Sequence, residues 1–328
     1  MQVVSVEELS GAALGSAVTI GAYDGVHLGH RHLLDLLHAQ ADDLGVPSAV
    51  VTFDRHPATL LRPESAPLLL TDNEQKLELL ASCGVDLTVV VRFDAARAHE
   101  PAEDFVDEVL CGALGARAIV VGEDFHFGRG RAGDVELLRR LGALKGFRVV
   151  GVPLSATDPV GAPQGPGAGR EAVSSTRIRA LLAAGDVAGA GRLLGRAHEV
   201  RGEVVHGDGR GGSELGMPTA NVAVPPGIAV PALGIYAGWC RRADRTLHPS
   251  ALSVGVRPTF ATAASPSPGP LVEAHLINFD GDLYGERVGV TFAERLRDER
   301  RFDRVEDLVE QMWADVDTVR RVLAAAGV

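Results

Sequence analysis

Two histidines stand three residues apart in a glycine-rich segment, G-A-Y-D-G-V-H-L-G-H at residues 21–30, which follows a short apolar run. His27 and His30 are therefore expected where a strand gives way to a helix. Such a helix start presents backbone N–H groups to phosphates, and imidazoles beside it can donate hydrogen bonds in a transition state. Solvated histidines in a turn would explain the spacing alone, and a zinc site lacks a suitably spaced third ligand. The flanking strand, Asp24 and the glycines favour the phosphate site (Gly21, Gly25 and Gly29).

Three other segments carry polar residues at similar positions. T-F-D-R-H-P (52–57) and V-G-E-D-F-H-F-G-R-G (121–130) each follow a predicted strand, and S-S-T-R-I-R (174–179) opens a predicted helix. The helix dipole disfavours arginines in a first turn, which predicts an anionic ligand there. Each segment alone could be a rigid turn or an ordinary capped helix. Together they predict a binding crevice at one edge of a sheet.

A second group of candidates lies in the C-terminal half. Thr219 and Asn221, in M-P-T-A-N, fall on one face of the chain if it is extended, and their neutral oxygens suit Mg²⁺ beside phosphates. The glycine-rich stretch 207–216 before them could cover those phosphates. Glu273, in L-V-E-A-H-L-I-N-F, could be a general base for an alcohol. A solvated glutamate on a strand is the commoner explanation, and the spacing alone does not reject it.

The elements that must position these residues differ between the halves of the chain. Up to about residue 155, continuous apolar runs alternate with segments of helical period, which predicts an α/β domain with parallel strands covered on both faces. Thr71 and Glu74 predict a capping box at the start of one helix. The predicted strands span residues 17–21, 48–53, 87–93, 118–122 and 148–153.

After residue 198, short β-runs separated by glycine and proline turns predict a small antiparallel barrel. Asp280-Gly281 predicts a hairpin between the last two strands. The chain ends in an amphipathic helix, and residues 158–170 and 261–270 are expected to be a loop and a hairpin tip. We expect two domains, residues 1–187 and 188–328. The predicted barrel strands span residues 199–205, 234–240, 250–256, 271–279 and 286–292.

Composition excludes several classes of function. The 328 residues carry 32 Lys and Arg against 43 Asp and Glu, a net charge of −11, which argues against nucleic-acid coats and anionic-membrane binders. The longest uncharged stretch, residues 215–240, contains prolines and Asn221 and predicts no transmembrane helix. The acidic N-terminus lacks the features of a signal peptide, and three widely spaced cysteines suit neither disulfides nor a cysteine metal site. We therefore expect a protein of the reduced cytoplasm.

Taken in order, the motifs resemble the bifunctional prokaryotic riboflavin kinase/FAD synthetase family over nearly the whole chain. The resemblance rests on T-I-G-A-Y-D-G-V-H-L-G-H, T-F-D-R-H-P, V-G-E-D-F-H-F-G, S-S-T-R-I-R, L-G-M-P-T-A-N-V, G-I-Y-A-G, P-T-F, V-E-A-H-L-I-N-F and L-R-D-E-R-R-F. It implies a Rossmann-like nucleotidyltransferase domain with an open parallel sheet, and a flavokinase-type barrel with a terminal helix. It also implies that riboflavin is phosphorylated with ATP to FMN, and that FMN is adenylylated by a second ATP to FAD with release of pyrophosphate.

The same resemblance implies roles for residues of this chain. Glu273 would take the proton of the ribityl 5′-hydroxyl, and His27 and His30 would stabilise the transition state of adenylyl transfer. In the adenylyltransferase, ATP would be bound by Gly21, Tyr23, Asp24, Gly29, Asp124, Ser175, Thr176 and Arg179, and the flavin by Phe53, His56, Pro57 and Phe127. In the kinase, ATP would be bound by Gly207, Gly209, Gly216, Thr219 and Asn221, the flavin by Arg297, Glu299 and Phe302, and Mg²⁺ by Thr219 and Asn221.

Two alternatives stay open. The chain could be a riboflavin kinase whose adenylyltransferase activity is different or lost, or a non-enzymatic flavin-binding regulator. The presence of all the assigned catalytic residues speaks against the regulator. The expected partners are the small-molecule substrates riboflavin, FMN and ATP, with no nucleic acid and no membrane, for a monomer or transient homo-oligomer.

Overall fold

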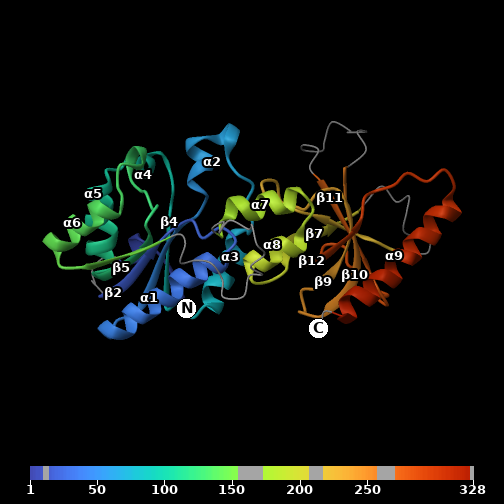
Figure 1. Cartoon of the computed structure of the whole chain (residues 1–328), viewed down its shortest axis with the longest axis horizontal. Helices are drawn as coiled ribbons and strands as arrows, with labels where there is room; N and C mark the ends of the chain where they lie inside the picture. The colour runs from blue at the N-terminus through green and yellow to red at the C-terminus, as the bar shows by residue number, and fades with distance from the viewer. Residues whose placement is uncertain (10–14, 154–172, 207–216, 257–269, 326–328) are drawn as a thin grey trace, which may run out of the picture. The chain divides into compact units, whose positions relative to one another are not determined.

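The computed structural model describes residues 1–9, 15–153, 173–206, 217–256 and 270–325 (Figure 1). These residues form two compact units, Met1–Ser175 and Thr176–Val328. The division of functional domains after residue 187 stays a prediction. The helix predicted to open at residues 174–179 is α7 (Ser175–Ala183), and a second helix, α8 (Val187–Leu194), follows it.

The first unit contains a parallel sheet, six-stranded within the described residues, in the order β1-β4-β3-β2-β5-β6. Its central strands are apolar runs with almost no exposure on either face, as expected for a sheet covered on both sides. The five predicted strands are confirmed, whereas the short, half-exposed edge strand β1 was not predicted. The strands are β1 (Gln2–Ser5), β2 (Ser16–Ile20), β3 (Ser48–Phe53), β4 (Leu87–Val91), β5 (Ala116–Gly122) and β6 (Arg148–Val152).

Helices cover both faces of this sheet (Figure 1). They are α1 (Leu28–Leu44), α2 (Pro57–Leu61), α3 (Asn73–Ser82), α4 (Ala95–Ala98), α5 (Ala102–Phe105), the π-helical η3 (Val106–Ala113) and α6 (Val135–Lys145), with single turns η1 (Glu7–Leu9), η2 (Pro63–Ser65) and η4 (Arg129–Arg131). Leu37 of α1 and Leu80 of α3 pack in one hydrophobic cluster. Val109 of η3 and Leu138 of α6 pack in the other. The predicted α/β class is confirmed.

The capping box of α3 lies one residue beyond its predicted position. The Asp72 carboxylate accepts the N–H of Gln75 at 2.7 Å, and the Gln75 side chain accepts the N–H of Asp72 at 3.0 Å. The Thr71 hydroxyl instead accepts the N–H of Gly25 at 3.2 Å. Thr71 with Glu74 and Asp72 with Gln75 both fit the four-residue pattern of a capping box. The Thr71 hydroxyl is engaged by the distant Gly25, and Asp72 is the residue that caps the helix.

The second unit is built on a closed antiparallel barrel, six-stranded within the described residues, in the order β10-β11-β8-β7-β12-β9. The barrel was predicted, but the short strand β8 was not among the predicted strands. The terminal helix α9 (Val305–Ala325) lies beside the barrel (Figure 1) and buries Val316, Val319 and Leu323. The strands are β7 (His198–Val205), β8 (Ala220–Ala223), β9 (Gly234–Arg241), β10 (Leu247–Val256), β11 (Pro270–Leu276) and β12 (Arg287–Arg297).

The predicted hairpin at Asp280-Gly281 is wrong. Strands β11 and β12 are not neighbours, because β11 pairs with β10 and β8, and β12 pairs with β7 and β9. Residues 277–286 form a connection that crosses to the other side of the barrel. An Asp-Gly pair indicates a turn locally, but it does not say which strand the chain pairs with afterwards.

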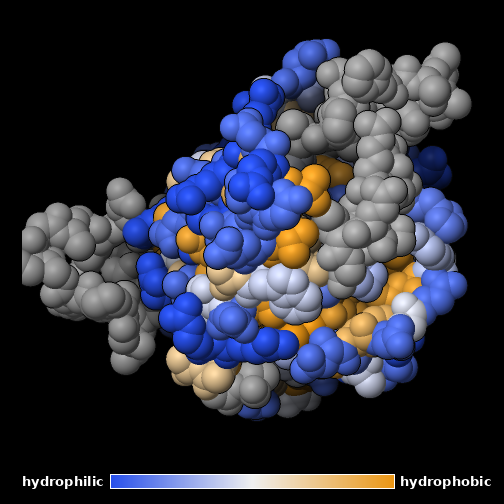
Figure 2. All heavy atoms as spheres, turned by 90° about the vertical axis from the view of Figure 1, so that its right-hand side faces the viewer, coloured by the Kyte–Doolittle hydropathy of each residue, from blue (hydrophilic) through white to orange (hydrophobic). Residues whose placement is uncertain are grey.

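Several predicted features fall outside the described residues. These are the loop at 158–170, the glycine-rich stretch 207–216 and the hairpin tip at 261–270 except for Pro270, which opens β11. The face of the second unit in Figure 2 is mostly hydrophilic, with hydrophobic residues grouped near its middle. Within the ranges that the structure describes, we find no helix with both the length and the apolar character of a membrane span.

Candidate active sites

The strand order of the first unit brings the predicted nucleotide segments to one edge. From β2 the chain proceeds to β3 on one side, and it later returns to β5 on the other side, so the order reverses between β2 and β5. Parallel sheets bind ligands beyond the carboxyl ends of two such strands. Residues 21–30 follow β2 and residues 121–130 follow β5, so the structure brings these two segments to the expected edge.

His27 and His30 stack on each other at the start of α1, with ring centroids 3.7 Å apart and an interplanar angle of 12°. Nδ1 of His27 accepts the backbone N–H of His30 at 3.2 Å, which leaves the proton of a neutral His27 on Nε2. The His30 ring is partly exposed, but its Nδ1 is buried and has no hydrogen-bond partner among the described residues. Burial, with a smaller effect of His27, lowers the pKa of His30 well below its usual value. His30 is therefore neutral at pH 7.

The backbone between β2 and α1 is strained. Tyr23 (φ 51°) and Val26 (φ 38°) adopt left-handed conformations that L-residues with side chains rarely adopt. Such residues cost of order 1–3 kcal/mol each and occur where surrounding contacts hold them. Gly29 is closely packed, because a Cβ there would lie 3.2 Å from the His27 ring and 3.3 Å from the Val173 carbonyl. Tertiary contacts therefore determine the shape of this loop.

Tyr23 and Asp24 anchor the loop with buried side chains. The Tyr23 hydroxyl shares a 2.7 Å hydrogen bond with the Thr19 hydroxyl. The Asp24 carboxylate accepts the backbone N–H groups of Leu70 at 2.8 Å and Thr71 at 3.3 Å. Both side chains are thus engaged within the protein, and their predicted contacts with ATP stay predictions.

A buried lysine that was not predicted from the sequence lies beside the end of β3. Lys76 of α3 is 7% exposed and donates from Nζ to the Phe53 carbonyl at 2.7 Å. Burial lowers its pKa to about 8, against the opposing effects of Asp24 and Asp54. The Lys76 ammonium is thus stabilised by the charges of one carboxylate in the loop after β2 and one in the loop after β3. The available sequence signal is the position of Lys76 one helical turn before Leu80, which is buried.

The residues predicted to bind flavin in the first unit gather after β3. Phe53 is the last residue of β3, and Pro57 is the first residue of α2. Between them, His56 caps α2, because its Nδ1 accepts the N–H of Ala58 at 3.1 Å. Since β3 is adjacent to β2, these side chains belong to the same edge as His27.

After β5, Asp124 is exposed and Phe127 is buried. Phe127 stacks on Phe125 with centroids 5.4 Å apart and belongs to a hydrophobic cluster of the sheet. Phe125 is partly exposed and forms the outer ring of this pair. The predicted roles of Asp124 toward adenosine and of Phe127 toward flavin stay predictions.

One residue of the 174–179 motif is linked directly to the β2–α1 loop. The Ser175 hydroxyl donates to the Asp24 carbonyl at 2.9 Å. Thr176 and Arg179 follow in α7 and belong to the second compact unit. Their predicted contacts with a polyphosphate stay predictions.

The second unit has a cavity of about 560 Å³ between the barrel and α9. Its walls come from the segment before β8, from β9, β10 and β11, from the end of β12 and from α9. Five residues that were predicted separately for the kinase site line it together: Thr219, Glu273, Arg297, Glu299 and Phe302. The structure thus brings most of the predicted kinase site into one cavity.

Glu273 and Asn221 are directly opposite each other on adjacent strands, so their side chains lie on the same side of the sheet. Burial, and to a smaller extent the charge of Glu299, raises the pKa of Glu273. Next along β11, Nδ1 of His275 donates to the Pro218 carbonyl at 2.9 Å, which fixes the backbone before Thr219. A carboxylate with a raised pKa therefore lies opposite Asn221 and lines the same cavity as Thr219.

Arg297 attaches α9 to the end of β12. Its guanidinium donates to both carboxylate oxygens of Asp315, at 3.0 Å from Nε and 2.6 Å from Nη2, and Gln311 donates to the same carboxylate at 2.9 Å. Leu308 and Met312, on the apolar stripe of α9, line the cavity. The amphipathic pattern of the terminal helix predicts that its apolar side chains are covered, but not that they face a ligand cavity.

A smaller cavity of about 180 Å³ adjoins the first, and Thr219 lines both. Its other walls include Phe279 and Tyr284, from the connection between β11 and β12. This cavity was not predicted from the sequence, because the same connection was interpreted as a tight hairpin.

The metal and loop predictions are tested only in part. Gly207, Gly209 and Gly216 lie outside the described residues. In the part of the chain that the structure describes, no three or more His, Cys, Asp or Glu side chains are grouped to hold a metal ion. Thr219 and Asn221 offer oxygen atoms of the kind that Mg²⁺ prefers.

Comparison with protein families matches the two units in succession. A FAD synthetase family model matches residues 10–160, and a riboflavin kinase family model matches residues 194–323. The fold and the two sites therefore define a two-part transferase, with a nucleotide-binding parallel sheet followed by a flavokinase-type barrel.

Curated relatives extend over nearly the full length. The bifunctional riboflavin kinase/FMN adenylyltransferase of Pseudomonas fluorescens is 37% identical over 310 residues, which cover 94% of this chain and 94% of the relative. The enzyme of the same name from Escherichia coli K12 is 35% identical over 306 residues, 93% of this chain and 92% of the relative. The chain belongs to the family of bifunctional riboflavin kinase/FMN adenylyltransferases. It converts riboflavin to FMN and FMN to FAD with ATP, which confirms the function implied by the sequence resemblance.

A solved structure has the same fold over the full length. The crystal structure of a macrolide-efflux protein from Streptococcus pneumoniae matches with a TM-score of 0.82 and 30% sequence identity, covering 97% of this chain and 98% of that chain. The chain is similar to that protein in architecture.

Proposed function

We propose that adenylyl transfer takes place at the edge formed by β2, β3 and β5, and that phosphoryl transfer takes place in the two adjoining cavities of the barrel. The observation that carries the assignment is the position of Glu273, a carboxylate of raised pKa in a cavity with the other predicted kinase residues.

In adenylyl transfer, an oxygen of the FMN phosphate forms a bond to the α-phosphorus of ATP, and the bond from that phosphorus to pyrophosphate breaks. The attacking phosphate is already ionised at neutral pH, so this site needs no general base. It needs donors for charge that develops on the α-phosphoryl oxygens. The Nε2–H of His27 and the first N–H groups of α1 supply donors. His30 stacks on His27 and adds a second imidazole at the same helix start.

The other assigned residues of this site complete the binding of ATP and flavin. Gly21 and Gly29 allow the backbone to approach phosphates closely, and Tyr23 and Asp24 hold the loop. Ser175, Thr176 and Arg179 bind the polyphosphate, and Asp124 binds the adenosine. Phe53, His56, Pro57 and Phe127 hold the flavin beside the reacting phosphate.

In phosphoryl transfer, Glu273 takes the proton of the ribityl 5′-hydroxyl while that oxygen bonds to the γ-phosphorus of ATP. The bond from the γ-phosphorus to the bridging oxygen breaks, and ADP leaves. Burial makes Glu273 a stronger base than an exposed carboxylate, which favours proton removal near neutral pH. Positioning and charge neutralisation supply the rest of the rate enhancement.

The two cavities divide the kinase substrates between them. The larger cavity holds riboflavin, because it contains Glu273, Arg297, Glu299 and Phe302. The smaller cavity holds the nucleotide beside Phe279 and Tyr284. The phosphoryl group then crosses at Thr219, which lines both cavities. Gly207, Gly209 and Gly216 cover the ATP phosphates, while Thr219 and Asn221 offer ligands to Mg²⁺, whose charge offsets that of the phosphates.

The properties of the whole chain support a proposal about its surroundings. Its three cysteines are free thiols, and its net charge is −11. We place the enzyme in the reduced cytoplasm as a monomer or transient homo-oligomer without nucleic-acid partners. Sedimentation of the purified chain and fractionation of cells test this placement.

The experiment that tests the two assignments is incubation with riboflavin, ATP and Mg²⁺ followed by chromatography of the flavins. FMN and FAD together agree with both sites. FMN alone would mean a kinase with a different or lost adenylyltransferase activity, and unchanged riboflavin would mean a flavin-binding regulator. Omission of Mg²⁺ should stop both reactions if the metal proposal is correct.

A further inference from the structure

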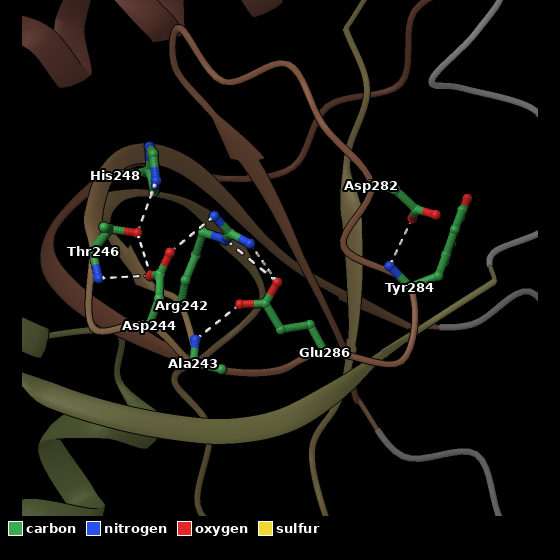
Figure 3. A network of polar contacts seen from close by, with 8 residues as sticks. All are labelled: Arg242, Ala243, Asp244, Thr246, His248, Asp282, Tyr284 and Glu286. Carbon is green, nitrogen blue, oxygen red and sulfur yellow. Dashed lines mark hydrogen bonds and ion pairs between the residues drawn. The ribbon is translucent and has the colours of Figure 1, made fainter.

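The network of polar contacts in Figure 3 contains Arg242, which contacts a residue of the smaller cavity. Phe279 lines that cavity, and the Arg242 guanidinium lies over its ring, 5.3 Å from the centroid. His248 meets the same ring edge-on, with centroids 5.0 Å apart. Gly281 packs so closely that a Cβ there would lie 2.8 Å from the Phe279 ring. A cation, an imidazole and a glycine backbone thus hold one aromatic ring.

Arg242 is itself held in place by two carboxylates. Its Nη2 donates to Glu286 at 2.9 Å, and its Nη1 donates to Asp244 at 3.2 Å. Glu286 also accepts the N–H of Ala243 at 2.8 Å, and Asp244 also accepts the N–H of Thr246 at 2.9 Å. The network therefore joins the turn between β9 and β10 to the residue before β12 (Figure 3).

We propose that Arg242 is a positioning residue for the nucleotide of the kinase reaction, because it holds Phe279 as the wall against which the nucleotide lies. This inference rests on the proposed function, in which the smaller cavity takes ATP. Arg242 is not among the residues that line either cavity, so it acts through Phe279. The contact of a cation with an aromatic ring near the surface is worth about two- to fivefold in an equilibrium constant, and this limits how much the held ring can add to ATP binding.

The first test is Arg242→Ala in the full chain. We expect the KM for ATP in riboflavin phosphorylation to rise about fivefold, with kcat and the KM for riboflavin within about twofold of wild type. Formation of FAD from supplied FMN should not change, and it measures the amount of active chain. Arg242→Lys keeps the cation without the two-carboxylate geometry and should give an intermediate KM. An unchanged KM for ATP in Arg242→Ala would overturn the inference.

Arg241→Ala is the matched control. Arg241 is the neighbouring residue at the end of β9, and its Nη2 donates to Glu199 at 2.8 Å, so its loss also breaks an ion pair of the barrel. Arg241 is 31% exposed and Arg242 is 26% exposed at the side chain. An equal rise of the KM for ATP in both variants would mean a general loss of barrel stability and would overturn the specific role of Arg242.

Phe279→Ala separates the inference from the proposed function. If it leaves the KM for ATP unchanged, the smaller cavity does not hold the nucleotide and the proposed function fails there. If it raises the KM while Arg242→Ala does not, only the role of Arg242 is overturned. In the Phe279→Ala background, Arg242→Ala should have no further effect, and a further rise would contradict action through Phe279. If Arg242→Ala does not fold, the KM of Arg242→Lys decides.

Discussion

The parallel sheet and the barrel use the same donor, ATP, with opposite electrostatics. The sheet edge holds two stacked imidazoles at a helix start, one of them neutral through burial. The barrel cavity holds a carboxylate whose pKa burial raises. In the proposed function, the nucleophiles explain the difference, because the FMN phosphate is already ionised and needs donors around the reacting phosphorus, whereas an alcohol must lose a proton. Burial thus lowers the pKa of an imidazole in one unit and raises the pKa of a carboxylate in the other.

The largest expected effect on either activity is that of a substitution at Glu273. Glu273→Gln keeps the size of the side chain but removes the base, and we expect kcat for riboflavin phosphorylation to fall about 10²- to 10⁴-fold. FAD formation from supplied FMN should be unchanged. Glu294→Gln, at an exposed glutamate of β12, is the control. Wild-type kinase activity in Glu273→Gln would exclude Glu273 as the base.

The complementary change is His30→Ala. It removes one imidazole of the stacked pair, and we expect FAD formation from FMN to fall about 10²- to 10³-fold while riboflavin phosphorylation is unchanged. His32→Ala, two residues further along α1 and so on another side of the helix, is the control. Loss of both activities in His30→Ala would contradict two separate sites.

A smaller effect distinguishes the two units by their response to acid. Burial lowers the pKa of His198 at the start of β7 to about 4, and its Nε2 hydrogen-bonds with the Ala229 carbonyl at 2.8 Å. Between pH 6.5 and 4 the unfolded chain binds more protons than the folded chain, so stability falls as the pH falls. From pH 7 to pH 5 the loss is about 2 kcal/mol.

Urea unfolding followed by tryptophan fluorescence measures this loss in the second unit, because Trp239 and Trp313 are the two tryptophans of the chain and both belong to that unit. His198→Phe should abolish the additional acid sensitivity. An equal dependence of the free energy of unfolding on pH in His198→Phe would show that other groups cause the loss of stability in acid.

The smallest expected effect is the response of the first unit to alkali. The pKa of Lys76 is lowered to about 8 from 10.5, so the unfolded chain binds more protons between these values and stability rises with pH. The gain from pH 7 to pH 9 is about 1 kcal/mol relative to Lys76→Met. Hydrogen exchange of β2 and β3 peptides in both proteins measures it, and parallel pH profiles would contradict the assignment.

The sequence predicts the strands of the first unit and the sheet edge at their carboxyl ends. Strands covered on both faces must be apolar throughout, and a parallel sheet brings its strand exits to one edge. Both properties can be recognised from short segments of sequence, so the apolar runs ending at Ile20, Phe53 and Gly122 were enough to predict the strands and the edge where they end. The gathering of Thr219, Glu273 and Phe302 followed from the resemblance, because they are far apart in sequence.

The remaining features depend on contacts between distant segments. The turn at Asp280-Gly281 was recognised, but the pairing of β12 with β7 and β9 is set by closure of the barrel. The choice of Asp72 over Thr71 as the cap depends on Gly25. Lys76 was overlooked because a lysine in a helix is normally solvated, and only the fold shows that it is enclosed.

The left-handed Tyr23 and Val26 have a consequence for efforts to make the enzyme heat-resistant. Relaxing this loop to an ordinary conformation would favour the folded state but would move the imidazoles that follow it. Selection for thermal tolerance with FAD synthesis as the readout should therefore leave these two torsion angles intact. Improvements should instead accumulate elsewhere on the sheet.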